Sequence, residues 1–165
     1  MFFHKIQNLK KNITILSVLV LVGSLIPMQA SALPITRLLS PPSDGYISKT
    51  YQQGSHYAID LKAAENSDVK AAADGIVTKV IDTCARVSLR CGGGYGNLVI
   101  IDHGNGLQTA YAHLNRVKTS VGTTVKQGQT IGSMGRSGKV KRADGIHLHF
   151  EVRENGLKQN PLNFM

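Results

Sequence analysis

Aromatic residues are scarce in this sequence: it has no tryptophan, five tyrosines and four phenylalanines among 165 residues. These aromatics do not alternate with basic residues, which argues against the stacking surface that single-stranded nucleic acids require. We therefore expect no nucleic-acid partner. The serine-nucleophile motif Gly-x-Ser-x-Gly, the zinc motif His-Glu-x-x-His and a Gly-rich phosphate loop ending in Lys-Ser/Thr are also missing. Their absence argues against α/β-hydrolases, helical-motif zinc peptidases and P-loop nucleotide hydrolases.

Long apolar runs are equally rare, and the single candidate lies near the N-terminus. Residues 13–26 are uncharged and mostly apolar, but they fall short of the roughly 20 residues that a membrane-spanning helix needs. Lysines precede the run and Ala30-Ser31-Ala32 follows it, which is typical of a secretory signal. We predict a signal peptide over 1–32, cleaved after Ala32, and an exported protein in the periplasm, outside the cell or at the cell wall. No membrane-spanning helix is then expected after cleavage; retention of the segment as an anchor is the alternative.

Acidic residues are outnumbered, with 10 Asp and Glu against 19 Lys and Arg. Removing Lys5, Lys10 and Lys11 with the signal leaves 16 basic and 10 acidic residues, a net charge of +6. A basic exported protein suits an anionic partner such as a cell-wall polymer or phospholipid, although the charge could serve solubility alone.

Cysteine occurs only twice, at Cys84 and Cys91. In an exported protein, two cysteines this close predict a disulfide that closes a short loop. A metal site is the weaker alternative, because there is one pair and no histidine lies between them.

A long helical period is also missing, and short strands separated by turn residues predict an all-β domain over 45–165, preceded by a short arm over 33–44. The dipeptide Asp74-Gly75 predicts a tight turn between two of these strands. Only 55–66 could equally carry a helical stripe. The expected strands are 45–51, 69–73, 75–81, 97–103, 107–114, short pieces within 117–131, and 147–153.

The C-terminal strand carries the first candidate for chemistry, His147-Leu148-His149-Phe150-Glu151-Val152-Arg153. Its polar residues alternate with apolar ones, so His147 and His149 share one face. One imidazole could bind a metal while its neighbour faces whatever the metal activates. The alternative is an edge strand whose histidines only face solvent.

A second candidate is His56-x-x-x-Asp60, which with a distant histidine would complete a three-ligand zinc site with an open fourth position. In a fully extended strand the two Cα atoms would be about 13 Å apart, too far to share an ion. The chain must therefore bend near Tyr57-Ala58 or form a helical turn.

Taken in order, these motifs form a larger set. It comprises Gly-x-His-x-x-x-Asp (54–60), Ala-Asp-Gly-Ile-Val (73–77), Gly-Tyr-Gly-Asn (94–97), Val-Ile-Ile-Asp-His-Gly-Asn-Gly (99–106), Tyr-Ala-His-Leu (111–114), Gly-Gln-x-Ile-Gly (128–132) and the strand 147–153. From about Pro41 to Leu162 the sequence resembles the lysostaphin/LytM-type zinc metallopeptidases, which cut peptide cross-links in bacterial cell walls.

The resemblance implies that His56, Asp60 and His149 bind one Zn²⁺ per chain and that His113 and His147 are catalytic. It implies a mostly antiparallel, twisted sheet of the duplicated-hybrid-motif or barrel-sandwich kind, with a narrow groove walled by loops. The cysteine loop and the loop 135–145 should be two of these walls.

The expected function is therefore that of an exported, monomeric zinc endopeptidase that hydrolyses peptidoglycan stem peptides or cross-bridges. One of the two catalytic histidines would accept a proton from water, and the other would donate a hydrogen bond to the developing oxyanion. A non-catalytic relative that binds the cell wall or regulates a partner hydrolase is the alternative. A biotinyl- or lipoyl-type carrier is disfavoured, because no lysine flanked by methionines stands in a tight hairpin.

Further candidates surround these five residues. Alternation along 107–114 places Tyr111 and His113 on one face of that strand. Tyr111 and Asn97 are expected in the substrate groove, with packing as the alternative for Tyr111. Glu151 could hydrogen-bond a ligand imidazole, or could instead pair with Arg153. Ala58 stands where the family usually has glycine, and Gly145-Ile146 replaces a Gly-Pro-like pair, which bears on substrate preference.

Overall fold

The computed structural model describes residues 39–86 and 88–165; the predicted signal peptide and most of the short arm lie outside the described residues. Eleven strands and two short 3-10 helices, η1 (Cys91–Gly94) and η2 (Pro161–Asn163), occur in this part of the chain. The strands are β1 (Tyr46–Lys49), β2 (Ile59–Lys62), β3 (Asp68–Lys70), β4 (Gly75–Ile81), β5 (Asn97–Asp102), β6 (Leu107–Leu114), β7 (Arg116–Val117), β8 (Thr124–Val125), β9 (Thr130–Ser133), β10 (Leu148–Glu154) and β11 (Leu157–Gln159).

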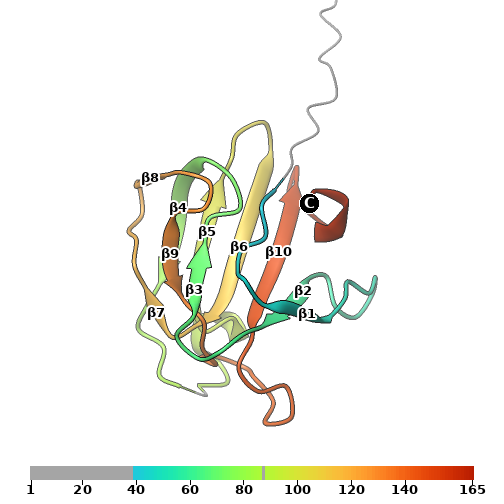
Figure 1. Ribbon diagram of the computed structural model, residues 1–165, viewed down its shortest axis with the longest axis vertical. Helices are drawn as coiled ribbons and strands as arrows, with labels where there is room; N and C mark the ends of the chain where they lie inside the picture. Colours follow the sequence, from blue (N-terminus) through green and yellow to red (C-terminus); the bar gives the residue numbers. More distant parts are fainter. Residues whose placement is uncertain (1–38, 87) are drawn as a thin grey trace, which may run out of the picture. The chain divides into compact units, whose positions relative to one another are not determined.

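The strands form two antiparallel sheets. The larger has the order β1-β2-β10-β6-β5-β4-β8, with β11 paired to β10, and the smaller has the order β3-β9-β7. In Figure 1 the smaller sheet lies over one face of the larger sheet, in front of β4 and β5. The all-β, antiparallel expectation is confirmed.

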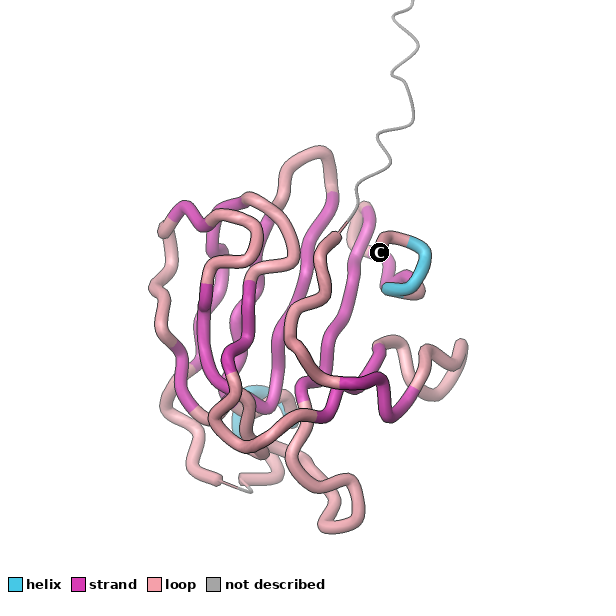
Figure 2. Tube along the Cα trace, viewed as in Figure 1, coloured by secondary structure: helices cyan, strands magenta, loops and turns pink. Residues whose placement is uncertain are grey.

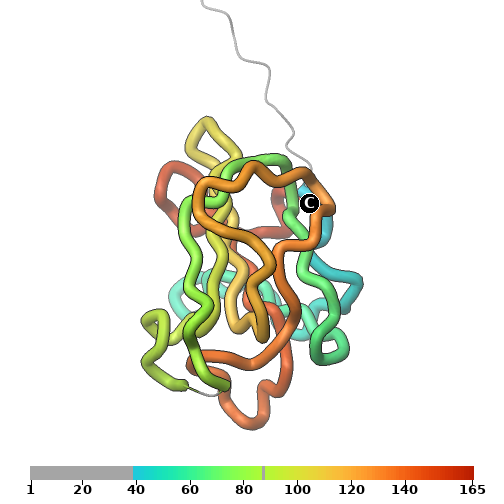
Figure 3. The backbone as a smooth tube through the Cα atoms, turned by 90° about the vertical axis from the view of Figure 1, so that its left-hand side faces the viewer, coloured from blue at the N-terminus to red at the C-terminus, as the bar shows by residue number. Residues whose placement is uncertain are grey.

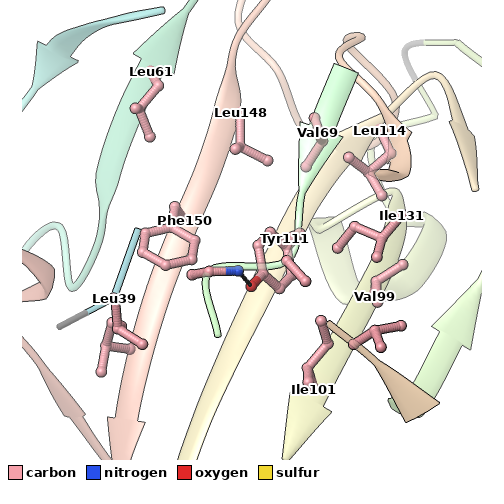
Figure 4. Packing of buried hydrophobic residues seen from close by; sticks show 14 of the residues in the cluster. Leu39, Leu61, Val69, Val99, Ile101, Tyr111, Leu114, Ile131, Leu148 and Phe150 are labelled. Carbon is pink, nitrogen blue, oxygen red and sulfur yellow. Dashed lines mark hydrogen bonds between the residues drawn. The ribbon is translucent and has the colours of Figure 1, made fainter. Parts of the chain in front are cut away.

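Alternating side chains explain this two-layer arrangement. On β5, Val99 and Ile101 point into the main core, while Leu98 and Ile100 point to a second, smaller cluster on the opposite face of the sheet. Figure 4 shows the main core, where Tyr111 packs beside Phe150. Because apolar residues occupy both faces of the central strands, β5 and β6 are buried on both sides.

Long-range pairing decides two local features that the sequence left open. The chain does turn before Gly75, but the strands on either side do not pair: β3 pairs with β9 in the small sheet, and β4 pairs with β5 and β8 in the large one. The segment 55–66 contains no helix, because its central residues form β2, which is held between β1 and β10. Local turn residues specify a change of direction, whereas distant pairing partners decide which sheet receives each strand.

Long loops gather at one end of the domain. Figure 2 shows loop backbone extending beyond the strands, and Figure 3 shows from a second direction that the loops around 82–96 and 135–147 leave the same end. Among the described residues, we find no helix with the length and apolar character needed to cross a membrane.

Candidate metal centre

Neighbouring strands bring Asp60 and His149 together. Asp60 on β2 and His149 on β10 are direct register partners, which places their side chains side by side on one face of the sheet. Nδ1 of His149 lies 3.0 Å from Oδ1 of Asp60. Alternation along β10 sends Leu148 and Phe150 into the main core, so His149 must face away from it.

His56 reaches the same point from the loop between β1 and β2. A tight turn pairs Gln52 with His56, and the chain bends at Ala58 before β2 begins. Nε2 of His56 therefore lies 3.1 Å from Oδ1 of Asp60. The bend expected between the two residues is confirmed, and buried Ala58 is not among the described residues with positive φ.

His113 is delivered to the site by a β-bulge. Asn97 pairs with Leu114 and Val99 with Tyr111, so β6 contains one residue more than β5 at this point. His113 has a φ of 62°, and its N–H donates to the carbonyl of Tyr95 at 2.8 Å. The predicted alternation of Tyr111 and His113 on one face is therefore wrong, because the bulge turns His113 away from the core that contains Tyr111.

The five residues predicted from the sequence are thus brought together. Ring centroids of His113 and His147 are 4.9 Å apart, those of His113 and His149 5.7 Å, and those of His56 and His149 5.3 Å. All five line one open cavity of about 370 Å³.

Backbone carbonyls determine which nitrogen carries the proton in three of the histidines. Nδ1 of His56, His113 and His147 lies 2.9, 2.8 and 3.1 Å from the carbonyls of Thr50, Ser137 and Gly145, respectively. A carbonyl can only accept, so each neutral ring carries its proton on Nδ1 and its lone pair on Nε2. His56 can then offer Nε2 to a metal, and His113 and His147 can each accept a proton at Nε2.

Burial and neighbouring polar groups shift the pKa values of the histidines and of Asp60. Burial, reinforced by the neighbouring His147 and His149, lowers the pKa of His113 to about 4. Burial also lowers the pKa of His147. For His149, burial acts in the same direction but is outweighed by hydrogen bonds to Asp60 and Glu151, which raise its pKa. Burial would raise the pKa of Asp60, yet the surrounding histidines lower it.

Glu151 lies directly behind His149. Its side chain is only 1% exposed, and Oε1 lies 3.3 Å from Nε2 of His149. The same oxygen accepts from Tyr95 and Lys158, and Oε2 accepts from Arg153 at 3.0 and 2.6 Å. Burial alone would raise the pKa of Glu151, but these hydrogen bonds hold it far below its usual range. Glu151 thus contacts both the candidate ligand His149 and Arg153. The two roles considered for it from the sequence, partner of a ligand imidazole and partner of Arg153, occur together.

Two loops form walls of the cavity, as expected. Gly93, Gly94 and Tyr95 line it from the loop after β4, and Lys139 and Asp144 line it from the loop before β10. Cys84 and Cys91 form a disulfide that closes the first of these loops, with Cα atoms 5.7 Å apart.

Neither of the two residues expected in the groove lies there. Tyr111 is fully buried, and its hydroxyl accepts from the backbone N–H of Ala72 at 2.8 Å, so packing is its role. The Asn97 side chain is buried and joins the backbones of Cys84 and Leu114. Asn97 therefore anchors the base of a loop wall and does not line the cavity.

Tyr95 and Lys158 line the cavity but are absent from the residues predicted for the site. Tyr95 lies in the motif 94–97, yet its sequence position gave no sign that its hydroxyl reaches Glu151. Lys158 had no signal at all; it reaches the site because β11 folds back on β10, where Lys158 pairs with Arg153.

The donor set fits a zinc ion. Potential ligand atoms of His56, Asp60 and His149 lie within 4.8 Å of one another. Imidazole nitrogen and carboxylate oxygen are normal zinc donors, and three protein ligands leave a fourth position for water or substrate.

Comparison with known proteins agrees with this geometry. Residues 54–161 match peptidase family M23. Over 108 residues the chain is 40% identical to the DD-carboxypeptidase/endopeptidase Mpg of Neisseria meningitidis, covering 66% of this chain and 22% of that protein. Over 126 residues it is 34% identical to the murein hydrolase activator NlpD of Escherichia coli, covering 75% of this chain and 30% of that protein.

A solved structure supports the same relationship. The catalytic domain of lysostaphin from Staphylococcus simulans superposes with a TM-score of 0.57 at 28% identity, covering 73% of this chain and 89% of that domain. The chain thus spans most of that catalytic domain but less than a third of the two relatives, Mpg and NlpD.

Proposed function

Because the chain belongs to peptidase family M23, we propose that it is an exported, zinc-dependent endopeptidase that hydrolyses peptide bonds of peptidoglycan. The observation that carries this proposal is the convergence of His56, Asp60 and His149 beside two further histidines in one cavity. Mpg, the relative at 40% identity, is named as a carboxypeptidase and endopeptidase. Export rests on the signal pattern over 1–32, which lies outside the described residues.

Both proposed histidine ligands present a suitable nitrogen atom. His56 offers Nε2, because its Nδ1–H is held by the Thr50 carbonyl. His149 offers Nδ1, because its Nε2 faces the Glu151 carboxylate. When bound, zinc supplies Lewis-acid chemistry: it polarises a carbonyl and makes water more acidic.

The two remaining histidines act on protons. Both hold Nδ1–H on a backbone carbonyl, so both present Nε2 for proton exchange. One of them accepts the proton of the attacking water, and the other, once protonated at Nε2, donates to the oxyanion as it forms. Losing either should reduce the rate roughly 10²–10³-fold, the range found for single oxyanion donors.

Incubation with purified peptidoglycan tests this function. We expect fragments whose masses correspond to cleaved peptide bonds, loss of activity with a chelator, and recovery with added zinc. The variants His113→Ala and His147→Ala should retain zinc and lose hydrolysis. A zinc-loaded wild-type protein that releases no peptide fragments from several wall preparations would contradict the proposal.

A regulatory role is the second candidate, and the similarity to NlpD, named as a murein hydrolase activator, favours it. Against it stands the fact that all five positions for metal binding and proton transfer are occupied by histidine or aspartate. The two functions separate in one assay. A regulator should raise the activity of a second wall hydrolase but release no fragments when it is incubated with peptidoglycan alone. The substitution His113→Ala should leave this stimulation unchanged.

A further inference from the structure

We propose that Tyr95 and Lys158 are positioning residues of this site. They hold Glu151, and through it the ring of His149, in the orientation that presents Nδ1 to zinc. The inference rests on the proposed function, and it concerns side chains outside the five that would touch metal or substrate.

The donor and acceptor of each hydrogen bond around Glu151 can be assigned by starting from Lys158. Its ammonium can only donate, and Nζ lies 2.7 Å from Oε1 of Glu151 and 2.9 Å from the hydroxyl oxygen of Tyr95. Because the Tyr95 oxygen accepts from Lys158, its single proton is directed to Oε1 of Glu151, at 2.8 Å. Lys158, Tyr95 and Glu151 therefore form a closed triangle of hydrogen bonds.

Glu151 is thereby fixed as an acceptor. Arg153 holds the other carboxylate oxygen with two donors, so rotation of the group would break bonds at both oxygens. Nδ1 of His149 is 3.0 Å from the Asp60 carboxylate, so it donates there when no metal is bound. When an ion replaces that proton, the Glu151 acceptor 3.3 Å from Nε2 holds the remaining proton on Nε2 and leaves the Nδ1 lone pair for the metal. Nδ1 faces Asp60, where the proposed ion would lie.

Tyr95 also connects His149 to the histidine on the bulge. Its carbonyl accepts from the backbone N–H of His113 at 2.8 Å, and its ring centroid lies 5.9 Å from that of His149. One residue thus contacts the backbone of a proton-transfer histidine and, through Glu151, the ring of a metal ligand.

The variant Tyr95→Phe tests the hydroxyl without changing charge. Partners of metal-ligating histidines are worth roughly 10–100-fold in metal affinity, and we expect the lower end, about tenfold, because Tyr95 acts through Glu151. Zinc affinity is measured by competition with a chromophoric chelator, and ligand geometry by the visible spectrum of the Co²⁺-substituted protein. The matched control is Tyr46→Phe on β1, whose side chain is largely exposed and lies outside the cavity.

Lys158 needs a different comparison, because Lys158→Met also removes a positive charge near the metal and by itself would strengthen cation binding. The readout is therefore coupling between the two positions. If Lys158 directs the Tyr95 hydroxyl, the tenfold effect of Tyr95→Phe should shrink to less than about threefold in the Lys158→Met background. Lys158→Arg, which keeps the donors and charge, should leave the tenfold effect in place.

Thermal unfolding of the metal-free variants separates positioning from folding. We expect Tyr95→Phe and Tyr46→Phe to unfold at similar temperatures, with weaker zinc binding and a changed cobalt spectrum only for Tyr95→Phe. Zinc affinity within about twofold of wild type together with an unchanged spectrum would overturn the role of Tyr95. Additive effects of Tyr95→Phe and Lys158→Met would overturn the role of Lys158. A wild-type protein that binds no zinc would instead remove the proposed function.

Discussion

Backbone strain at His113 leads to a prediction whose sign is unusual. At a φ of 62°, a residue with a Cβ atom pays about 1–2 kcal/mol relative to the right-handed conformation. Both His113→Ala and His113→Gly remove the imidazole and its hydrogen bond to Ser137, but only glycine relieves the strain. Glycine also loses about 0.5–1 kcal/mol more than alanine through backbone entropy. The balance should make His113→Gly more stable than His113→Ala by roughly 0.75 kcal/mol, and by about 1.5 kcal/mol at most.

The preceding residue in the strand provides the control. Ala112 is also buried on β6, but it is not among the described residues with positive φ. Ala112→Gly should therefore lower the free energy of unfolding by about 1 kcal/mol, the ordinary direction for a strand. Urea unfolding of the metal-free proteins measures all three variants against wild type.

If His113→Gly is no more stable than His113→Ala while Ala112→Gly behaves as expected, the bulge does not store strain at His113. If glycine proves more stable than alanine at this position, the conformation that directs the His113 imidazole into the cavity lowers the stability of the fold, as expected for a strained residue at a functional site.

Three further predictions concern the core, the disulfide and the surface charge. Burial raises the pKa of Tyr111 to about 12, so the unfolded chain loses this proton at a lower pH than the folded protein does. The free energy of unfolding should therefore fall by roughly 2 kcal/mol between pH 10 and 12. This fall should be smaller in Tyr111→Phe, and an equal fall in both proteins would contradict the prediction. Replacing Cys84 and Cys91 by serine should lower the free energy of unfolding by about 2–3 kcal/mol, the value for a disulfide that closes a short loop, and should slow wall hydrolysis. Unchanged stability in denaturant titrations would argue against a structural role for this disulfide. Sedimentation with isolated peptidoglycan should show weaker binding at high salt if net charge drives capture, whereas salt-independent binding would remove that role for charge.

Much of the fold follows from local pattern. Apolar runs bounded by turn residues locate β5 and β6, and the alternation in β10 identifies its core face. The spacing of His56 and Asp60 required the bend that is found at Ala58. The resemblance to the family assigned roles to the five site residues, four of which were already candidates from their spacing, and the structure brings all five to one cavity.

What the sequence did not reveal depends on contacts between distant segments. The bulge that reverses His113 arises from register between β5 and β6, and strict alternation therefore placed it with Tyr111. Lys158 joins the site because a hairpin after β10 returns beside Arg153. Asn97 follows a loop in the sequence, which suggested a place in the groove. Its side-chain amide instead hydrogen-bonds the backbones of Cys84 and Leu114, which come together only in the folded chain.

Zinc content of the adjacent variants His147→Ala and His149→Ala tests the central claim most directly. The two residues are separated by Leu148 alone, but only His149 lies within reach of Asp60 and His56 as a candidate ligand. We predict about one zinc per chain in the wild type and in His147→Ala, and strongly reduced zinc in His149→Ala, measured after dialysis against a weak chelator. Loss of zinc from His147→Ala with retention in His149→Ala would contradict the assignment of roles in this site.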